Sequence, residues 1–160
     1  MLKTGVIFPP ASLPPMEQAL AQARAAAERG EVPVGAVIVD SATGIVLSAA
    51  GNRTEELADP TAHAEVLAIR AACAARGEPR LPDCDLYVTL EPCGMCAAAI
   101  SFARLRRVYF GAYDVKGGGV EHGPRFFHQA TCHHAPEIYG GLEERRAAEL
   151  LKEFFRRRRL

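Results

Sequence analysis

The sequence predicts an α/β layered domain in which helices cover a mixed β-sheet. Apolar runs of strand length alternate with segments whose apolar residues recur at helical spacing. The order strand-helix-strand-helix-strand places a parallel pair of strands in that sheet. With 160 residues, 49% of them hydrophobic, the chain is large enough for one domain with a substantial core. We expect an extended arm over residues 1–15, which is rich in proline, and a single domain over residues 16–160.

The first half of the chain predicts a helix, a hairpin and a second helix. Apolar residues recur at helical spacing over residues 16–29, and Gly30 follows them. Apolar runs at 34–39 and 45–49 flank a turn signal of the sequence Asp-Ser-Ala-Thr-Gly, which indicates two paired strands. The next helix is expected over residues 61–76.

The second half predicts strands and helices in alternation. Strands at 86–90 and 107–111 enclose a helix over 93–103, an order that favours parallel pairing across a crossover helix. A long loop rich in Gly and His follows, with a short strand at 137–139. The chain ends in a helix over 142–159 whose apolar side consists of Leu and Phe residues.

The composition narrows the class of protein. Formal net charge is zero and charged residues make up 24% of the chain, as in ordinary soluble proteins. No apolar run approaches the roughly 18 residues that a membrane span needs. Prolines interrupt the start of the chain, so we expect no signal peptide. Five cysteines, two of them in one motif, suit a reducing compartment better than a disulfide framework. We expect a cytoplasmic protein without a membrane segment.

Two short motifs carry the chemistry. In the first, His63 lies two residues before Glu65; the second is Pro92-Cys93-Gly94-Met95-Cys96. One imidazole and two thiolates make three zinc ligands, and a zinc site with three protein ligands and one open position is catalytic rather than structural. Together, H-x-E and P-C-x-x-C are the known signature of zinc-dependent nucleobase deaminases.

We expect His63, Cys93 and Cys96 to hold one zinc ion. Bound zinc acts as a Lewis acid and lowers the pKa of water toward neutrality. Glu65 is not needed as a ligand, and it is therefore the expected catalytic residue that moves protons between water and base. Both motifs fall where helices are expected to begin. The partial positive charge of a helix N-terminus stabilises thiolates there.

Further segments resemble the cytidine/deoxycytidylate deaminase superfamily, and in particular its tRNA-specific adenosine deaminase branch. The resemblance extends from about residue 16 to residue 159, on Glu31-Val32-Pro33-Val34-Gly35-Ala36-Val37, Gly51-Asn52-Arg53, Asp59-Pro60-Thr61-Ala62-His63-Ala64-Glu65, Leu86-Tyr87-Val88-Thr89-Leu90-Glu91-Pro92-Cys93, Gly111-Ala112-Tyr113-Asp114 and Phe154-Phe155-Arg156. It implies a three-layer α/β/α sandwich with a mixed five-stranded sheet, one zinc ion per chain and a homodimer. It also implies conversion of adenosine to inosine at the wobble position of a tRNA anticodon loop, whose splayed bases suit a pocket enzyme.

The resemblance assigns three substrate contacts. Asn52 stands where the family has an Asn that contacts the base, and an amide pairs with a base edge through donor and acceptor together. The alternative for Asn52 is a support of the strand end or turn. Asp114 and Phe155 lie in segments that are near the nucleic acid in relatives. Arg156–Arg159 either follow phosphates or interact favourably with the dipole at a helix C-terminus.

After Lys116 the chain departs from the branch pattern. Residues 117–127 replace the usual Ala/Gly-Ser-rich turn and short helix, and Glu121 is poorly suited to lie beside phosphate. A deaminase of a free purine or pyrimidine base or nucleoside, of guanine, cytosine or cytidine type, is therefore the alternative. A third hypothesis is a non-catalytic zinc-stabilised binding module, against which the presence of Glu65 argues.

Three other clusters have open interpretations. Arg125, Phe126 and Phe127 either stack bases or pin their loop to the core. Cys132-His133-His134 could supply a fourth ligand or a second metal site, but we favour a substrate-side or structural role for the His pair. Arg104, Arg106 and Arg107 form a basic cluster that could bind phosphate, although the net charge of the chain is zero.

Overall fold

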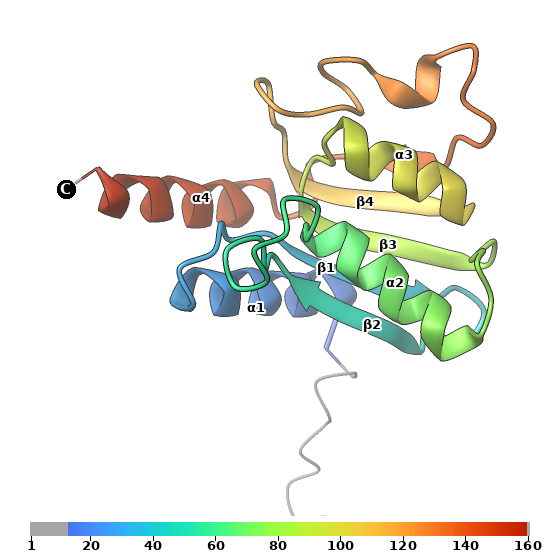
Figure 1. The fold of residues 1–160 in the computed structure, drawn as a ribbon, viewed down its shortest axis with the longest axis horizontal. Coiled ribbons are helices and arrows are strands. Elements are labelled where there is room, and N and C mark those ends of the chain that lie inside the picture. The colour runs from blue at the N-terminus through green and yellow to red at the C-terminus, as the bar shows by residue number, and fades with distance from the viewer. Residues whose placement is uncertain (1–12, 160) are drawn as a thin grey trace, which may run out of the picture.

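Five strands form one mixed sheet with helices on both faces (Figure 1). The structure, a computed structural model, describes residues 13–159. The strands are β1 (Gly35–Asp40), β2 (Val46–Gly51), β3 (Cys84–Leu90), β4 (Arg107–Ala112) and β5 (Glu137–Tyr139). The helices are α1 (Pro15–Glu28), α2 (Ala64–Arg76), α3 (Gly94–Ala103) and α4 (Glu144–Arg158), with a short 3-10 helix η2 (Phe126–His128). The predicted α/β sandwich is confirmed.

The strand order β2-β1-β3-β4-β5 determines which strand ends lie side by side. β1 pairs antiparallel with both β2 and β3, whereas β3, β4 and β5 run parallel. α3 is the crossover between β3 and β4. Because the carboxyl ends of parallel strands lie at one edge of a sheet, the segment after β3 and the segment after β4 emerge side by side.

The two faces of the sheet bury separate apolar clusters. On one face, Ile38 and Leu86 pack with the alanines of α2 and with Ile100 of α3. On the other face, Val37 packs with Met16 of α1 and with Ala147 in the first half of α4. Ile38 and Val37 are neighbours in β1, and consecutive strand residues point to opposite faces. Alternate residues of β1 therefore contribute to the apolar clusters that anchor helices on both faces of the sheet.

Most expected elements agree with the structure to within two residues. The main exception is α2, which begins at Ala64 rather than near residue 61. Asp59 explains the difference, because its Oδ1 accepts hydrogen bonds from the backbone N–H and the hydroxyl of Thr61, at 2.8 and 2.7 Å. This local turn keeps Thr61 out of the helix and leaves His63 as the N-cap residue.

The chain ends depart slightly from expectation. Of the expected arm over residues 1–15, residues 1–12 lie outside the described part, and α1 begins at Pro15. The last helix begins at Glu144 instead of Leu142, because the backbone N–H of Leu142 still donates to Phe110 O of β4 at 3.0 Å. Within residues 13–159, no helix has the length and apolar content that a membrane crossing requires.

Candidate metal centre and active site

Three predicted ligands converge at the beginnings of two helices. His63 is the N-cap residue of α2, Cys93 is the N-cap residue of α3, and Cys96 lies in the first turn of α3. His63 Nδ1 is 3.7 Å from Cys93 Sγ and 3.5 Å from Cys96 Sγ. Within the described residues, these three side chains form the one group of His, Cys, Asp or Glu able to surround a metal ion.

The spacing fits a tetrahedral zinc ion. Zn–S bonds of about 2.3 Å and Zn–N bonds of about 2.0–2.1 Å separate tetrahedral N and S ligands by about 3.6 Å, close to the two distances observed. Carboxylate oxygens do not complete this ligand set, so a fourth position remains for water or substrate. Both α2 and α3 present their positive ends to the cluster, which favours the thiolate form of its ligands.

The two thiols of the cluster differ in pKa, because each lies close to the other. A hydrogen bond from the Cys96 thiol and, to a smaller extent, the His63 side chain lower the pKa of Cys93 to about 4, against the effect of burial. The same hydrogen bond and burial raise the pKa of Cys96. Two thiolates at this separation repel each other, and the pair therefore retains one proton. A divalent cation between them removes that conflict.

Glu65 lies beside the cluster in the first turn of α2, and only 4% of it is exposed. Burial raises the pKa of Glu65 to about 7, against the opposing effects of a hydrogen bond from its own backbone, the His63 charge and a hydrogen bond with Cys96. A carboxyl group with this pKa both accepts and gives up a proton near neutral pH. Its position agrees with the predicted catalytic role, because it borders the three-ligand group without being part of it.

Asn52 connects the end of β2 to the start of α2. Its Oδ1 accepts a hydrogen bond of 2.9 Å from the backbone N–H of Ala64, and the residue is 8% exposed. One end of the amide thus supports the helix start, as the structural alternative proposed. No hydrogen bond from the amide nitrogen of Asn52 to another described residue is present, which leaves that end for a base.

The two other predicted substrate contacts lie apart from each other. Asp114 begins the loop after β4, and its backbone N–H donates to Glu91 Oε1 at 3.0 Å. Its own Oδ1 accepts from the N–H of Gly117 at 2.9 Å, so Asp114 also shapes the loop. Phe155 is 44% exposed on the far half of α4, which projects from the rest of the molecule (Figure 1). The structure therefore joins Asp114, but not Phe155, to the segment that contains Cys93.

Cys132 and His134, which follow η2, have structural contacts. Cys132 Sγ donates to His134 O at 3.2 Å and lies 3.6 Å from the Ser101 hydroxyl. His134 Nε2 is 2.7 Å from Leu105 O, so this side chain ties the loop to the end of α3. Among residues 13–159, the Cys132-His133-His134 segment is not part of any metal-binding group. The structural interpretation of the His pair is favoured over a second metal.

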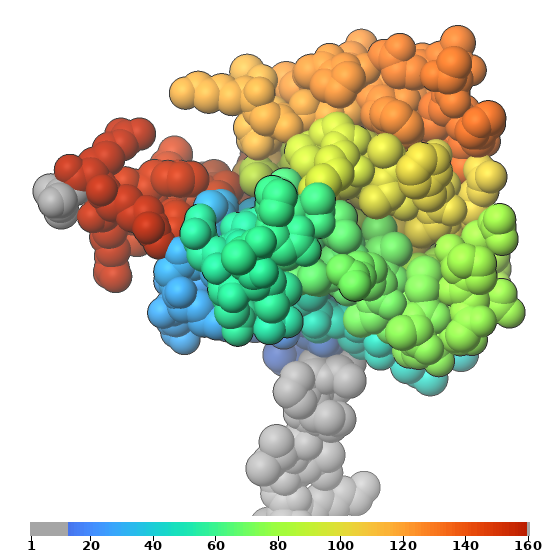
Figure 2. Space-filling model, viewed as in Figure 1, coloured from blue at the N-terminus to red at the C-terminus, as the bar shows by residue number. Residues whose placement is uncertain are grey.

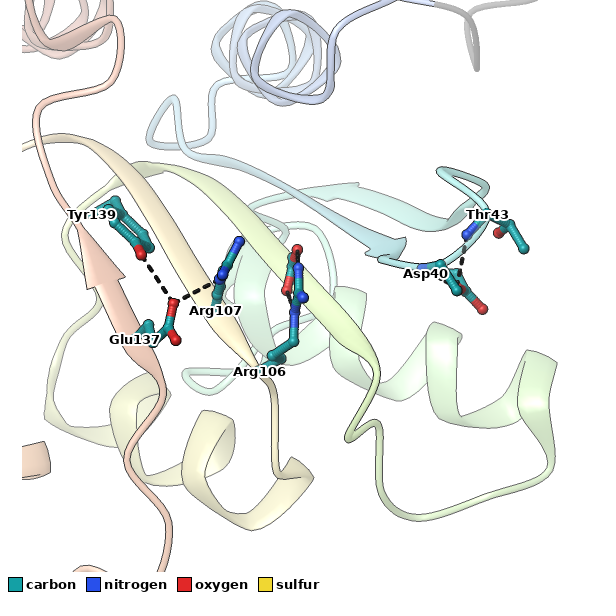
Figure 3. Close-up of polar contacts among 8 residues, drawn as sticks. Asp40, Thr43, Arg106, Arg107, Glu137 and Tyr139 are labelled. Atoms are coloured by element: carbon teal, nitrogen blue, oxygen red, sulfur yellow. Dashed lines mark hydrogen bonds and ion pairs between the residues drawn. The ribbon is translucent and has the colours of Figure 1, made fainter.

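Two further sequence alternatives are decided by packing. Phe126 and Phe127 are partly buried against the main core, which favours pinning of the loop over base stacking. Arg106 binds both carboxylate oxygens of Asp85, at 2.9 and 2.7 Å, and Arg107 pairs with Glu137 at 2.7 Å (Figure 3). Carboxylates thus offset the charges of two of the three arginines in the basic cluster.

Glu91 is a buried acid to which sequence reasoning gave no role of its own. Its side chain is fully buried at the end of β3, two residues before Cys93. Burial raises its pKa, but hydrogen bonds from the Asp114 backbone and the His122 side chain outweigh this, and the net pKa is lowered. The sequence does contain a signal that Glu91 has partners: it is a carboxylate directly after an apolar strand, where burial of an unpaired charge is too costly.

The fold and the site together define a zinc-dependent nucleobase deaminase. The family model of the cytidine and deoxycytidylate deaminase zinc-binding region matches residues 14–112. The tRNA-specific adenosine deaminase of Agrobacterium fabrum is 63% identical over 145 residues, which cover 91% of this chain and 94% of that protein. The enzyme of the same name from Bacillus subtilis is 41% identical over 88% of this chain and 86% of its own length.

Solved structures agree with this assignment. One, from a study of A-to-I editing by tRNA:A34 deaminases at the wobble position, is 64% identical, with a TM-score of 0.83 over 86% of this chain and 98% of its own. A guanine deaminase from Bacillus subtilis is 32% identical, with a TM-score of 0.61 over 91% of this chain and 92% of its own. This chain belongs to the cytidine and deoxycytidylate deaminase family, and within it to the tRNA-specific adenosine deaminases.

Proposed function

We propose that this protein hydrolyses the exocyclic amine of adenosine at the wobble position of a tRNA anticodon, giving inosine and ammonia. The observation that carries the chemistry is a buried carboxyl group, Glu65, beside a three-ligand metal cluster. The substrate is supported by 63% identity over 91% of the chain to a tRNA-specific adenosine deaminase. A cytoplasmic location agrees with a tRNA substrate.

In this proposal, His63, Cys93 and Cys96 hold one zinc ion, which supplies Lewis acidity and lowers the pKa of water. Glu65 accepts a proton from the attacking water at a carboxylate oxygen. It delivers that proton to N1 of the purine as the C6–O bond forms, and then moves a proton to the amine as the C6–N bond breaks. Water and adenosine thus give inosine and ammonia, and Glu65 is regenerated.

Asn52 and Asp114 are the proposed contacts to the base and its flanking nucleotides. The amide nitrogen of Asn52 lies beside the start of α2, which also carries His63 and Glu65. Asp114 lies in the loop that borders the start of α3. Asn52 is hydrogen-bonded to the residue after His63, and Asp114 to Glu91, which lies two residues before Cys93; these links support the proposed contacts.

Phe155 is proposed to contact RNA outside the pocket. Between α1 and α4 lies a groove of about 990 Å³, whose lining combines apolar residues (Leu20, Phe155), basic residues (Arg24, Lys152, Arg156) and two acidic ones (Glu149, Glu153). The far half of α4 stands out from the body in the space-filling view (Figure 2). An aromatic side chain among cations suits the stacked bases and phosphates of a nucleic acid.

A homodimer is also part of the proposal. α3 presents Phe102, which is 71% exposed, and Met95, which is 38% exposed, on its outer side. Exposed apolar side chains on a helix that begins at the site suit contact with a second copy. Sedimentation equilibrium should give twice the chain mass, and a monomer across the concentration range would contradict this part.

The substrate is tested by product analysis. Zinc-loaded protein is incubated separately with an arginine tRNA that carries adenosine at the wobble position and with free guanine, cytosine, cytidine and adenosine. Ammonia and the mass of each product are measured. Inosine in the tRNA, with free compounds unchanged, supports the proposal. Turnover of a free base with tRNA unchanged would replace it with the second candidate, which similarity to a guanine deaminase favours.

A further inference from the structure

Glu91 is surrounded by donors from a single loop. Its Oε1 accepts from the Asp114 N–H at 3.0 Å and lies 2.8 Å from His122 Nδ1. Its Oε2 accepts from three consecutive backbone N–H groups at 2.9–3.2 Å, those of Val120, Glu121 and His122. Both oxygens of this fully buried side chain are therefore used by residues 114–122.

The same loop is pressed against the start of α3. The Gly119 N–H donates to Pro92 O at 2.8 Å. A Cβ on Gly119 would lie 2.5 Å from Gly94 N and 2.8 Å from Cys93 C, closer than side chains tolerate. Loop and helix thus meet through backbone atoms, directly beside a candidate zinc ligand.

Gly118 shows how closely the loop encloses Glu91. A Cβ on Gly118 would lie 2.4 Å from Glu91 Oε2 and 2.4 Å from Asp114 O. The glycine run from Gly117 to Gly119, which separates this chain from the usual pattern of its branch, therefore has a steric reason. It lets the backbone N–H groups that follow converge on one carboxylate.

We propose that Glu91 is a positioning residue, which fixes the loop from Asp114 to His122 against the first turn of α3 and so holds the substrate-facing side of the site in one arrangement. The inference rests on the proposed function, because it assigns this loop to substrate. Glu91 acts through the loop and through Pro92, and it does not touch the reacting atoms.

A carboxylate is needed for this role because of the number of donors. Two ionised oxygens offer about four lone-pair sites and form charge-assisted hydrogen bonds, whereas a glutamine offers one acceptor oxygen and an NH₂ group that only donates. In Glu91→Gln, at least one buried backbone N–H, that of Asp114 or those on the other oxygen, must lose its acceptor. Buried donors without acceptors are costly, and the loop is expected to move away from α3.

Glu91→Gln is compared with Glu78→Gln, which removes the same charge from an exposed side chain after the C-terminal end of α2, at the opposite end of that helix from His63. Zinc content and the absorption spectrum of the cobalt-substituted protein should be unchanged in both variants, since neither residue is a candidate ligand. In Glu91→Gln, hydrogen exchange of the amides over residues 118–122 should accelerate. The KM for an anticodon stem–loop should rise by about tenfold with kcat changed by less than about threefold, because uniform substrate binding is lost. Glu78→Gln should match wild type.

Three outcomes would overturn the proposal. The first is unchanged amide exchange in the loop of Glu91→Gln. The second is faster exchange with unchanged kinetics, and the third is a loss of activity that follows zinc content with KM unchanged. If Glu91→Gln does not fold, Gly118→Ala decides, because its added Cβ displaces the loop and keeps the acid. It should then raise KM in the same way, and wild-type kinetics would overturn the proposal.

The failure of the proposed function is distinguishable from the failure of this inference. If wild-type protein deaminates only a free base, tRNA editing is excluded, but amide exchange still reports the anchoring of the loop. The KM of Glu91→Gln is then measured with that base. An unchanged KM would show that Glu91 does not position the substrate.

Discussion

At the scale of single residues, Glu65 is the position at which proton transfer and metal binding are most clearly assigned to different groups. It borders the metal cluster, it is 4% exposed, and burial raises its pKa to about 7. In the proposed mechanism, Glu65 transfers protons and does not bind the metal. Its removal should therefore affect the rate of reaction and leave metal binding unchanged.

Glu65→Gln should keep one zinc ion per chain and lose at least about 100-fold in kcat, the lower end of what general acid–base catalysis supplies. Zinc is measured by atomic absorption on the same samples that are used for single-turnover kinetics. The Ala variant should behave in the same way. A parallel loss of zinc and activity would make Glu65 a ligand and invalidate the scheme.

Asn52 has two roles that a pair of variants separates. Asn52→Ala removes the acceptor for the Ala64 N–H and should cost about 1 kcal/mol of unfolding free energy, as loss of a helix cap does. Asn52→Asp keeps that acceptor and should cost less than about 0.5 kcal/mol. Urea unfolding measures both.

The activities of the same two variants then test the contact with the base. If the amide nitrogen pairs with the base, Asn52→Asp and Asn52→Ala should both lose activity. Full activity in Asn52→Asp would mean that Asn52 only supports the helix.

The residue scale also shows what sequence could predict. The spacing of His63, Cys93 and Cys96 was sufficient to predict a three-ligand group, because helix starts bring such residues together. Glu91 could not be assigned, since its partners lie 23–31 positions away and become donors only when the loop folds back. Long-range contacts to backbone N–H groups leave no side-chain pattern.

At the scale of elements, the hairpin between β1 and β2 depends on Asp40. Its Oδ1 accepts from the N–H groups of Ala42 and Thr43 at 2.9 and 3.2 Å (Figure 3), and its Oδ2 pairs with Arg76 at the end of α2. The Ala42 hydrogen bond, followed by that from Thr43 and the Arg76 charge, lowers the pKa of Asp40 despite partial burial.

The lowered pKa fixes the sign of a pH effect. A carboxylate with a lower pKa when folded stabilises the fold above its unfolded pKa of about 3.9, and this stability is lost as the pH falls through the folded pKa. Asp40→Asn should therefore unfold at lower urea than wild type at pH 7. The difference should close below about pH 4. A difference that persists at low pH would show that the charge of Asp40 is not responsible.

Element boundaries were predictable where one residue ends the element. Gly77, with φ of 66°, ends α2 as expected, because glycine accepts the left-handed conformation without strain. The start of α2 was misplaced, since Asp59 competes for the backbone around Thr61. That competition is local, but its result also depends on the position of His63 in the cluster.

At the scale of the whole molecule, the metal centre joins α2 to α3, and through α3 it joins β3 to β4. Zinc bound at 100 times its Kd contributes about 2.7 kcal/mol to folding, so chelation should lower Tm by about 5–10 °C. Differential scanning calorimetry with and without EDTA measures this. Cys93→Ser lacks a complete ligand set, so EDTA should change its Tm only a little. An equal fall in Tm with EDTA in that variant would exclude the site as the cause.

The fold class and a parallel pair of strands within a mixed sheet were predictable, because alternating strand and helix patterns with a crossover allow few topologies. The projection of α4 was not. Its apolar residues predict a helix with one buried side, yet Phe155 remains 44% exposed on a helix that extends beyond the sheet. Where a helix leaves the core is decided by three-dimensional packing and by partners, which periodicity does not encode.

The most direct test of the account is hydrolysis of an anticodon stem–loop, with adenosine at the wobble position, in water enriched in oxygen-18. Mass spectrometry of the digested product is combined with measurement of ammonia. The account predicts inosine that carries the heavy isotope at that position, with one ammonia released for each inosine formed. Unchanged adenosine with fully zinc-loaded protein, or inosine without the heavy isotope, would contradict hydrolytic deamination of tRNA by this site.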